Sequence, residues 1–251
     1  MQENRPFVLT IAGFDPSGGA GVLADAKTFE QHCVYGFAVN TGNTIQTENE
    51  FFEIQWTDID FVLKSLDKLL QNYTIKAVKI GIIPSLDYLK EIVSLVKKLS
   101  PKTKIVWDTV LKSTTKFNFT TIENKAVLIE ILEKIDLITP NYNEILQLSS
   151  EEINADIIAT ILSKYCAVLL KGGHNPDKIG VDYLYLENEI LKLAPNNTLV
   201  FEKHGSGCVL SSAITANLAL GQHLKTACTN AKKYIETYLE SNQTKLGYHH
   251  V

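Results

Sequence analysis

The 251-residue sequence lacks a run of apolar residues long enough to cross a membrane, since none reaches the roughly 18 that a transmembrane helix needs. Its first residues are polar, and the apolar run that follows, Phe7–Ala12, has no cleavage pattern behind it. We therefore expect no signal peptide and no membrane association. A basic excess is also missing: 24 Lys and Arg stand against 28 Asp and Glu, for a net charge of −4. This balance argues against nucleic acid as the main partner, although a local phosphate pocket needs no net positive charge.

Cysteine is scarce and scattered. The four cysteines form no C-x-x-C pair and no cluster with histidine at zinc spacing; they are Cys33, Cys166, Cys208 and Cys228. We expect reduced thiols in a cytoplasmic protein. A linker rich in Gly, Pro or Ser is absent as well, and the sequence shows no internal repeat. One domain over residues 1–251 is therefore predicted.

Apolar segments of strand length alternate with helical segments along the chain. The predicted strands are Phe7–Ala12, Phe37–Ile45, Ile75–Ile83, Lys104–Leu111, Asp136–Thr139 and Ala167–Lys171. The predicted helices are Ala20–His32, Asp58–Gln71, a helix capped by Ser85 and running to about Leu99, Asn124–Lys134, Gly207–Leu220 and Leu224–Glu240. A hairpin is expected over Asp182–Leu193, turning near Glu187 and Asn188. This alternation predicts an α/β fold with a mostly parallel central sheet and helices on both faces.

A polar, Thr-rich segment without periodicity, Lys112–Thr121, follows one of the predicted strands. It is predicted to be a loop. Because ligands of open α/β sheets bind outside the carboxyl ends of the strands, this loop is expected to lie near the ligand.

The first candidate for chemistry is the glycine-rich segment Gly13–Gly21, between a predicted strand and a predicted helix. The start of a helix carries unpaired N–H groups, and glycine lets a ligand approach them closely. The spacing matches neither G-x-G-x-x-G nor a Walker A loop. A tight strand-to-helix turn without a ligand is the plain alternative.

The second candidate is the segment His204-Gly205-Ser206-Gly207-Cys208, which opens a helix of small residues. Two glycines before a helix start form a row of N–H donors suited to an anion. A cysteine in the first turn is expected to have its thiolate favoured by the helix dipole. Transfer of a phosphoryl group needs such donors and a base near the attacking hydroxyl. A capped helix with an inert cysteine is the alternative.

Three further polar features follow predicted strands. Glu144, in Asn141-Tyr142-Asn143-Glu144, can hold Mg²⁺ through water or simply stabilise its own helix. Asp108 lies in an apolar strand, where an unpaired carboxylate costs several kcal/mol, so we expect it near the strand end beside a cation or donors. Lys171, before two glycines, either faces nucleotide phosphates or lies in solvent. All these features fall near the carboxyl ends of predicted strands, where a parallel sheet binds its ligands.

The sequence resembles the hydroxymethylpyrimidine/phosphomethylpyrimidine kinases of thiamine biosynthesis, which belong to the ribokinase-like superfamily. The resemblance covers nearly the whole chain, and its first and last motifs are the most specific. The motifs are, in order, Ile11-Ala12-Gly13-x-Asp15-Pro16-Ser17-Gly18-Gly19-Ala20-Gly21, Ala24-Asp25-x-Lys27-Thr28-Phe29, Tyr35-Gly36, Gln46-Thr47, Lys79-Ile80-Gly81, Asp108-Thr109-Val110, Thr139-Pro140-Asn141-x-x-Glu144, Lys171-Gly172-Gly173-His174 and His204-Gly205-Ser206-Gly207-Cys208-x-Leu210-Ser211-Ser212-Ala213.

The resemblance implies a three-layer α/β/α fold and phosphorylation that depends on ATP and Mg²⁺, first of the hydroxymethyl group of 4-amino-5-hydroxymethyl-2-methylpyrimidine and then of the monophosphate. A homodimer is expected on the same ground. The residues that it places at the substrate are Gly13, Asp25 and Gln46 around the pyrimidine, and Ile82 and Val110 against its ring. The residues that it assigns to phosphoryl transfer are Gly205, Ser206 and Gly207 as an anion hole, Cys208 as catalytic base, Asp108 and Glu144 for the metal, and Lys171 and Asn141 for ATP.

The sequence departs from the family pattern at four places. Phe14 replaces a small polar residue and is expected to narrow the pocket mouth. Ile82 stands for a methionine and Thr109 for a proline. The loop after Lys112 lacks a Gly-Asp pair, which bears on how the monophosphate is handled.

Two other functions compete with this one. A pyridoxine or pyridoxal kinase uses the same scaffold and also phosphorylates a hydroxymethyl group on a flat nitrogen heterocycle. A pyrimidine-binding regulatory protein without kinase activity is the third hypothesis, against which the intact Cys208, the anion-hole glycines and Glu144 argue.

Overall fold

The computed structural model describes residues 5–111, 119, 124–149, 153–174, 179–196 and 200–249. The strands are β1 (Phe7–Phe14), β2 (Tyr35–Gln46), β3 (Phe51–Trp56), β4 (Ile75–Ile80), β5 (Lys104–Trp107), β6 (Leu137–Ile138), β7 (Ala167–Leu170), β8 (Asp182–Leu186) and β9 (Glu189–Leu193). The α-helices are α1 (Gly21–Gln31), α2 (Ile59–Asn72), α3 (Leu86–Leu99), α4 (Lys125–Leu132), α5 (Tyr142–Gln147), α6 (Ala155–Leu162), α7 (Ser206–Ala219) and α8 (Leu224–Glu240), and a 3₁₀ turn covers Gly172–His174.

Within the described residues, the strands form one sheet in the order β3-β2-β1-β4-β5-β6-β7-β8-β9. The six central strands, which follow one another as β2, β1, β4, β5, β6 and β7, run parallel. Strand β3 pairs antiparallel with β2 at one edge, and β8 pairs antiparallel with both β7 and β9 at the other. The mostly parallel sheet predicted from the alternation of segments is therefore confirmed. The hairpin predicted over Asp182–Leu193 is confirmed as β8 and β9.

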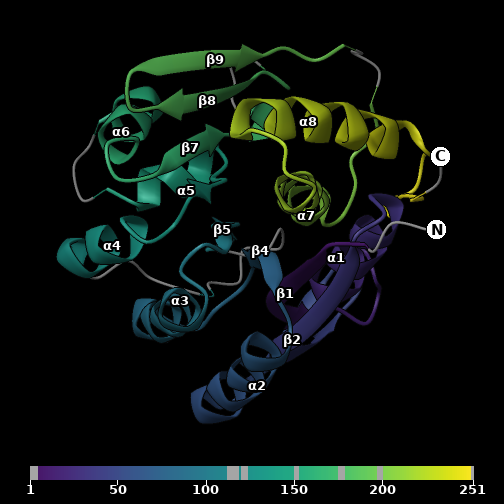
Figure 1. Ribbon diagram of the computed structural model, residues 1–251. Coiled ribbons are helices and arrows are strands. Elements are labelled where there is room, and N and C mark those ends of the chain that lie inside the picture. The colour runs from purple at the N-terminus through teal and green to yellow at the C-terminus, as the bar shows by residue number, and fades with distance from the viewer. Residues whose placement is uncertain are drawn as a thin grey trace.

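Helices cover both faces of the sheet (Figure 1). One face carries α2 to α6 over an apolar core, and the other carries α1, α7 and α8 over a second core. Helix α7 packs directly on β1, β4 and β5. Its small side chains from Ser211 onward, among them Ser212 and Ala213, are buried, so this helix lies close to the sheet.

Most predicted helices are confirmed to within two residues at either end, and α8 has the predicted bounds. The predicted N-cap at Ser85 is also confirmed, since its side chain accepts a hydrogen bond from the N–H of Tyr88. Strand β3 and helices α5 and α6 were not among the predicted elements. Two predicted strands are too long: β4 ends at Ile80 and β5 at Trp107.

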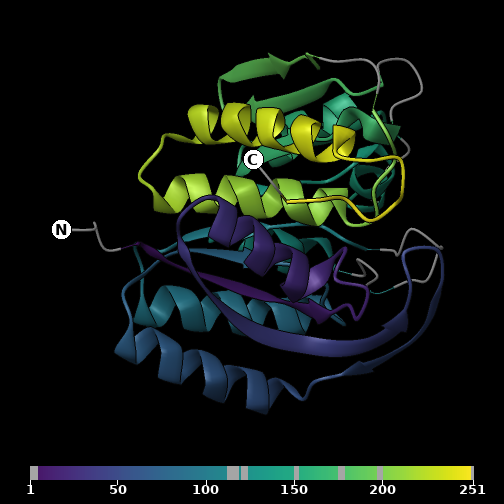
Figure 2. The ribbon, with the colours of Figure 1, turned by 90° about the vertical axis from the view of Figure 1, so that its right-hand side faces the viewer.

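The carboxyl ends of the parallel strands and the starts of α1 and α7 lie at one edge of the molecule, at the right in Figure 2. The predicted loop Lys112–Thr121 lies outside the described residues except for Phe119, whose ring packs against Phe51 and Trp56 of β3. None of the helices in the described part has the length and hydropathy needed to cross a membrane.

Candidate active site

The start of α7 offers unpaired backbone donors. Gly205 is the N-cap and adopts a left-handed conformation with φ of 72°. A Cβ on Gly205 would lie 2.0 Å from the carbonyl oxygen of Gly19, so the approach of these two segments requires glycine. In the described part of the chain, the N–H groups of Gly207 and Cys208 have no hydrogen-bond acceptor. Two free donors at a helix start form a site suited to an anion.

Asp15 organises the glycine-rich segment that packs against this helix start. Its carboxylate accepts hydrogen bonds from the N–H of Ser17 (2.9 Å), the hydroxyl of Ser17 (2.8 Å) and the N–H of Ala20 (2.9 Å). It also lies 2.8 Å from Nε2 of His204. Burial opposes the charge of Asp15, but these partners, His204 first, hold the pKa of its carboxyl below the usual value. Neither Asp15 nor His204 was expected from the sequence to have a role of its own.

Two of the residues expected around the pyrimidine lie against each other. A Cβ on Gly13 would lie 2.3 Å from Cδ1 of Ile82, so only glycine leaves room for this isoleucine. The carbonyl of Ile82 accepts a hydrogen bond from the Thr41 hydroxyl (2.8 Å), which fixes its backbone to β2. Val110 is half-buried just beyond β5. Gln46 is half-buried at the end of β2, and among the described residues its side chain has no hydrogen-bond partner.

Asp25 lies behind this part of the site, without exposed surface. Both of its carboxylate oxygens are 2.9 Å from Nζ of Lys79, and the hydroxyls of Thr10 (2.5 Å) and Ser212 (2.6 Å) also donate to it. The family resemblance implies that Asp25 meets the pyrimidine. In this structure four donor contacts from the protein occupy the carboxylate, and no part of it is open to a ligand.

Lys79 is the buried partner of Asp25 and was not predicted to belong to the site. Burial disfavours its ammonium charge, but Asp25 outweighs that effect and holds the pKa of Lys79 above its usual value. The pair therefore consists of two charged groups enclosed by the protein.

A second charged cluster lies at the ends of β5, β6 and β7. Nζ of Lys171 is 3.0 Å from Asp108 and 3.9 Å from Glu144. The hydroxyls of Thr139 (3.1 Å) and Ser211 (3.2 Å) donate to the two oxygens of Asp108. As expected from the sequence, the buried Asp108 has a cation and hydrogen-bond donors beside it.

This cluster faces the start of α7. A Cβ on Gly207 would lie 3.2 Å from Nζ of Lys171 and 4.0 Å from both carboxylate oxygens of Asp108. The structure therefore brings Lys171 and Asp108 next to the proposed anion hole. The sequence alternative that placed Lys171 in solvent does not hold, because burial and two carboxylates enclose its ammonium group.

The two carboxyl groups of the cluster differ in their ionisation. Burial opposes the charge on Asp108, but Lys171 and Lys79 hold its pKa below the usual value. Burial, together with the neighbouring Asp108, raises the pKa of Glu144 to about 7, although Lys171 acts in the opposite direction. The pKa of Lys171 rises to about 12, because the two carboxylates outweigh its burial.

Asn141 and Glu144 also cap α5. The side-chain oxygen of Asn141 accepts from the N–H of Asn143 and of Glu144 (both 2.9 Å), and Glu144 accepts from the N–H of Asn141 (2.8 Å). Thr109, where the family has proline, places its hydroxyl 3.4 Å from Glu144. The expectation that Glu144 stabilises its own helix is confirmed, and the same side chain also faces Lys171 of the charged cluster.

Cys208 lies between the two clusters and is half-buried. The backbone of Gly21 lies beside it and lowers the pKa of the thiol. Burial raises the pKa of the Cys208 thiol to about 12; Lys79 lowers it, while Asp108 and Asp25 raise it further. The predicted preference for the thiolate is therefore wrong for the free protein, because burial and two nearby carboxylates outweigh the helix start and Lys79.

Asp108 and Glu144 are the carboxylates expected to bind magnesium. In the described residues no group of three or more His, Cys, Asp or Glu side chains assembles around a common point. Magnesium bound with a nucleotide usually takes only one or two carboxylates and completes its shell with phosphate oxygens and water. Two buried carboxyl groups, one with its pKa raised by the other, fit that arrangement, because a cation favours the ionised form of both.

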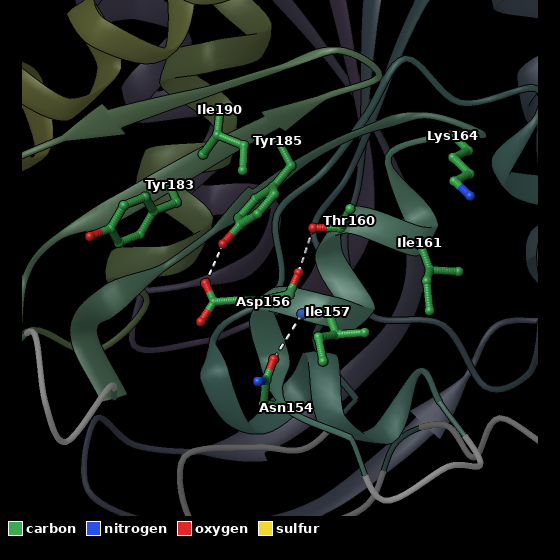
Figure 3. A pocket seen from close by; sticks show the side chains of 9 residues that line it. All are labelled: Asn154, Asp156, Ile157, Thr160, Ile161, Lys164, Tyr183, Tyr185 and Ile190. Atoms are coloured by element: carbon green, nitrogen blue, oxygen red, sulfur yellow. Dashed lines mark hydrogen bonds between the residues drawn. The ribbon is translucent and has the colours of Figure 1, made fainter.

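A separate groove lies between α6 and the β8–β9 hairpin (Figure 3). Tyr185 donates a hydrogen bond to Asp156 inside it, and Ile157, Ile161 and Ile190 expose apolar surface along it. None of the predicted site residues lines this groove.

Comparison with known proteins places the chain among vitamin kinases. A family model described as phosphomethylpyrimidine kinase matches residues 15–251. The hydroxymethylpyrimidine/phosphomethylpyrimidine kinase of Aquifex aeolicus (strain VF5) is 34% identical over 249 residues, which are 95% of this chain and 96% of that protein.

Solved structures agree with this similarity. The crystal structure of phosphomethylpyrimidine kinase from Clostridium difficile 630 is 33% identical and has a TM-score of 0.77, covering 92% of this chain and 98% of that one. The pyridoxal kinase from Staphylococcus aureus in complex with pyridoxal is 26% identical and has a TM-score of 0.83, covering 98% of this chain and 92% of that one.

Proposed function

The chain belongs to the phosphomethylpyrimidine kinase family, and on that basis we propose that it phosphorylates 4-amino-5-hydroxymethyl-2-methylpyrimidine and its monophosphate with ATP. These reactions are steps of thiamine biosynthesis. One observation carries the proposal: the free N–H groups at the start of α7 face Lys171 and Asp108 on one side, while the thiol of Cys208 lies beside them.

The anion hole is proposed to act on the transferring phosphoryl group. Negative charge spreads over its three equatorial oxygens in the transition state. The N–H groups of Gly205, Ser206 and Gly207 are proposed to donate to these oxygens. Gly205 fixes the helix start, and the N–H of Gly207 is free for this role, whereas that of Ser206 donates to the carbonyl of Lys203 at 3.4 Å and has to turn to the phosphoryl group.

The cation of Lys171 is proposed to hold the phosphates of ATP, with Asn141 close by. Its neighbours Asp108 and Glu144 would hold Mg²⁺, which supplies positive charge that neutralises the phosphate oxygens. Asp108 also keeps Nζ of Lys171 pointed at the start of α7, because their 3.0 Å contact is buried.

The acceptor alcohol is proposed to bind between Gly13, Ile82 and Val110, with the amide of Gln46 supplying one donor and one acceptor to the pyrimidine. The thiolate of Cys208, formed by loss of the thiol proton to solvent, is proposed to accept the hydroxyl proton while the oxygen attacks the phosphorus. Because burial favours the thiol, this thiolate is the minor form in the free protein. Asp25, enclosed by the protein, is proposed to act through Lys79 and Ser212 on the wall of this pocket.

A pyridoxal kinase is the second candidate, and one observation favours it. The fold overlaps the S. aureus pyridoxal kinase with a TM-score of 0.83, against 0.77 for the C. difficile phosphomethylpyrimidine kinase. The sequence identities run the other way, 26% against 33%. Identity reflects the pocket residues as well as the fold, so we keep the pyrimidine as the proposed substrate.

The deciding experiment compares kcat/KM with ATP for the pyrimidine alcohol, its monophosphate and pyridoxal in parallel coupled assays. We expect the pyrimidine alcohol to be the best of the three. A higher kcat/KM for pyridoxal would assign the protein to the second candidate, and no turnover of any of them, with tight pyrimidine binding, would support a binding protein.

Cys208→Ala tests the proposed base. We expect kcat to fall while the Kd of the pyrimidine alcohol, measured by calorimetry, stays within about twofold, because the sulfur acts on the hydroxyl proton and not on the ring. Full activity in this variant would refute the assignment. Cys228→Ala is the matched control, since this buried cysteine of α8 lies outside the site.

We also propose that the protein is a cytoplasmic homodimer, as the family resemblance implies. Sedimentation velocity at micromolar concentration measures the assembly state, and a monomer at all concentrations would contradict it.

A further inference from the structure

Two buried charged residues close the base of the loop that follows β7. Asp182, at the start of β8, is 4% exposed, and Lys232, on α8, is 9% exposed. Nζ of Lys232 donates to Asp182 (2.8 Å) and to the carbonyl oxygen of Gly180 (2.7 Å). Neither residue belongs to the catalytic cluster, and the proposed mechanism does not use them.

The carboxylate of Asp182 reaches the backbone next to Lys171. One of its oxygens accepts a hydrogen bond from the N–H of Gly172 (2.8 Å), while the other faces Lys232. The N–H of Gly180 in turn donates to the carbonyl of Gly172 (3.1 Å). The two ends of the loop are thus joined at Gly172, the residue after Lys171.

The backbone of Lys171 is therefore held on both sides. Its own N–H donates to the carbonyl of Pro140 (2.8 Å), and the following N–H, that of Gly172, donates to Asp182. Fixing the two peptide groups that flank a Cα fixes the direction of its Cβ. The side chain of Lys171 is thereby directed toward Asp108 and the start of α7.

Close packing leaves this backbone little freedom. A Cβ on Gly172 would lie 2.0 Å from the carbonyl oxygen of Val181, so the two backbone segments are too close here for any residue but glycine. A shift of the Asp182 carboxylate would release the N–H of Gly172, and with it one of the two constraints on Lys171.

We propose that Asp182 and Lys232 are positioning residues for the nucleotide: Asp182 holds the peptide group after Lys171, and Lys232 holds Asp182. This inference rests on the proposed role of Lys171 in binding ATP phosphates. The two residues act on ATP and not on the alcohol, because the pyrimidine is expected at Gly13 and Ile82, whereas the hydrogen bonds of Asp182 and Lys232 go to Gly172, to Gly180 and to each other.

If Asp182 and Lys232 only stabilised the fold, a different result would be expected. Their loss would lower the free energy of unfolding and would either weaken the binding of both ligands or leave both unchanged. If the two residues position the nucleotide, their loss weakens nucleotide binding alone. The two roles therefore differ in the ratio of the Kd of the nucleotide to the Kd of the alcohol.

The test measures the Kd of AMP-PCP with Mg²⁺ and, separately, the Kd of the pyrimidine alcohol, both by calorimetry on the full chain. We expect Asp182→Ala to raise the Kd of AMP-PCP at least tenfold and to change that of the alcohol less than twofold. Lys232→Met is expected to raise the Kd of AMP-PCP severalfold. Asp182→Asn keeps an oxygen for the N–H of Gly172 and is expected to lie closer to the wild type than Asp182→Ala.

Lys225→Met is the matched control. Lys225 also lies on α8 and also bridges to the β8–β9 hairpin, but its ion pair with Glu189 is exposed. We expect this variant to bind both ligands as the wild type does. If Asp182→Ala does not fold, the comparison of Lys232→Met with Lys225→Met decides.

The proposal is overturned if Asp182→Ala and Lys232→Met bind AMP-PCP like the wild type, or if each loses affinity for both ligands equally. A wild type that binds AMP-PCP but phosphorylates neither the pyrimidine nor pyridoxal would refute the proposed function. The positioning test would still be decided by binding alone.

Discussion

Lys79 and Asp25 bury opposite charges side by side, and neither side chain has exposed surface. Taking two charges out of water is costly, and their mutual attraction offsets that cost only where hydrogen bonds satisfy the remaining positions. Thr10 and Ser212 provide those hydrogen bonds to Asp25. The pair lies between β1, β4, α1 and α7, so it ties the sheet to the two helices that begin at the site.

Removing one partner of the Lys79–Asp25 pair is expected to destabilise the folded protein strongly. Lys79→Met leaves Asp25 buried without its cation, and we expect the free energy of unfolding at pH 7 to fall by about 3–5 kcal/mol. Urea denaturation measures it. The double variant Lys79→Met with Asp25→Asn is expected to recover part of the loss, because no charge then remains buried.

Arg5→Met serves as the control for this prediction, since the Arg5–Glu30 pair is exposed. We expect no measurable change in the unfolding midpoint. Equal midpoints for Lys79→Met and the wild type would show that Asp25 is not charged in the folded protein.

The cysteines are expected to differ sharply in their reactivity. The pKa of Cys208 is about 12, so below that pH the sulfur is mainly a thiol, and the thiolate is the species that reacts. At pH 8 we expect iodoacetamide to label the exposed Cys33 and to leave Cys166, Cys208 and Cys228 largely unlabelled. Because the pKa is raised, the labelling rate of Cys208 should still increase between pH 8 and pH 10. Peptide mass spectrometry follows each site, and rapid labelling of Cys208 at pH 7 would contradict the raised pKa.

At the scale of elements, the loops at the site depend on glycines in the left-handed region. Gly205 and Gly221 both have positive φ, of 72° and 83°, and they lie at opposite ends of α7. A Cβ would clash with Gly19 at the first position and would meet open space at the second. Alanine at the two positions therefore separates two effects: the loss of stability from left-handed backbone strain, and the loss of activity from displacing the glycine-rich segment.

Gly205→Ala and Gly221→Ala should both lose about 1–2 kcal/mol from left-handed strain. Only Gly205→Ala must also push the glycine-rich segment away from the start of α7. We expect its kcat to fall by about 10²-fold or more, as when an oxyanion donor is lost, while Gly221→Ala keeps the wild-type kcat. Thermal unfolding and steady-state kinetics on both variants check this. Equal kcat values for the two variants would contradict the assignment of the anion hole to the start of α7.

The elements that the sequence did not predict were missed for different reasons. Strand β3 is an edge strand in which no residue is fully buried, and its residues Phe52–Trp56 alternate between apolar and polar, so a strand pattern was present in the sequence but was not used. Helix α6 is a short apolar stretch, ADIIATIL, too short to show a helical period. Strand β5 was predicted too long because Leu111, in the loop beyond it, is buried as deeply as a strand residue.

The sequence predicted the parts of the site that are built from consecutive residues. It did not predict the contacts between residues that are far apart in the sequence. The motifs ending β1, β5 and β7 and opening α7 were expected at one edge of a parallel sheet, which the structure confirms. Lys79 and Asp25 are 54 positions apart, His204 and Asp15 are 189 apart, and Lys232 and Asp182 are 50 apart. A local pattern carries no information on such pairs, since only the tertiary packing of the elements brings their members together.

At the scale of the whole molecule, a single sheet runs through the described chain from β3 at one edge to β9 at the other. The cores on its two faces both draw on strands from the first and second halves of the sequence. A part of the sheet therefore cannot lose its neighbours without exposing the rest, which favours cooperative unfolding.

We therefore predict one unfolding transition in urea. Trp56 lies in the edge strand β3 and Trp107 in the buried strand β5, so tryptophan fluorescence reports on both regions. Its midpoint should coincide with that of far-ultraviolet circular dichroism. Two separate midpoints would show that the chain has more than one domain, against the prediction from the sequence.

Helix α7 begins only at residue 206, yet it covers β1, β4 and β5, which are complete by residue 107. A ribosome makes the chain from its N-terminus, so the face of β4 and β5 that α7 covers stays bare while about a hundred further residues are added. The nascent protein must wait in that half-covered form, exposed to chaperones and to aggregation, until the helix that carries the proposed anion hole emerges. Completion of the catalytic site and closure of the core are thus the same event in the synthesis of this protein.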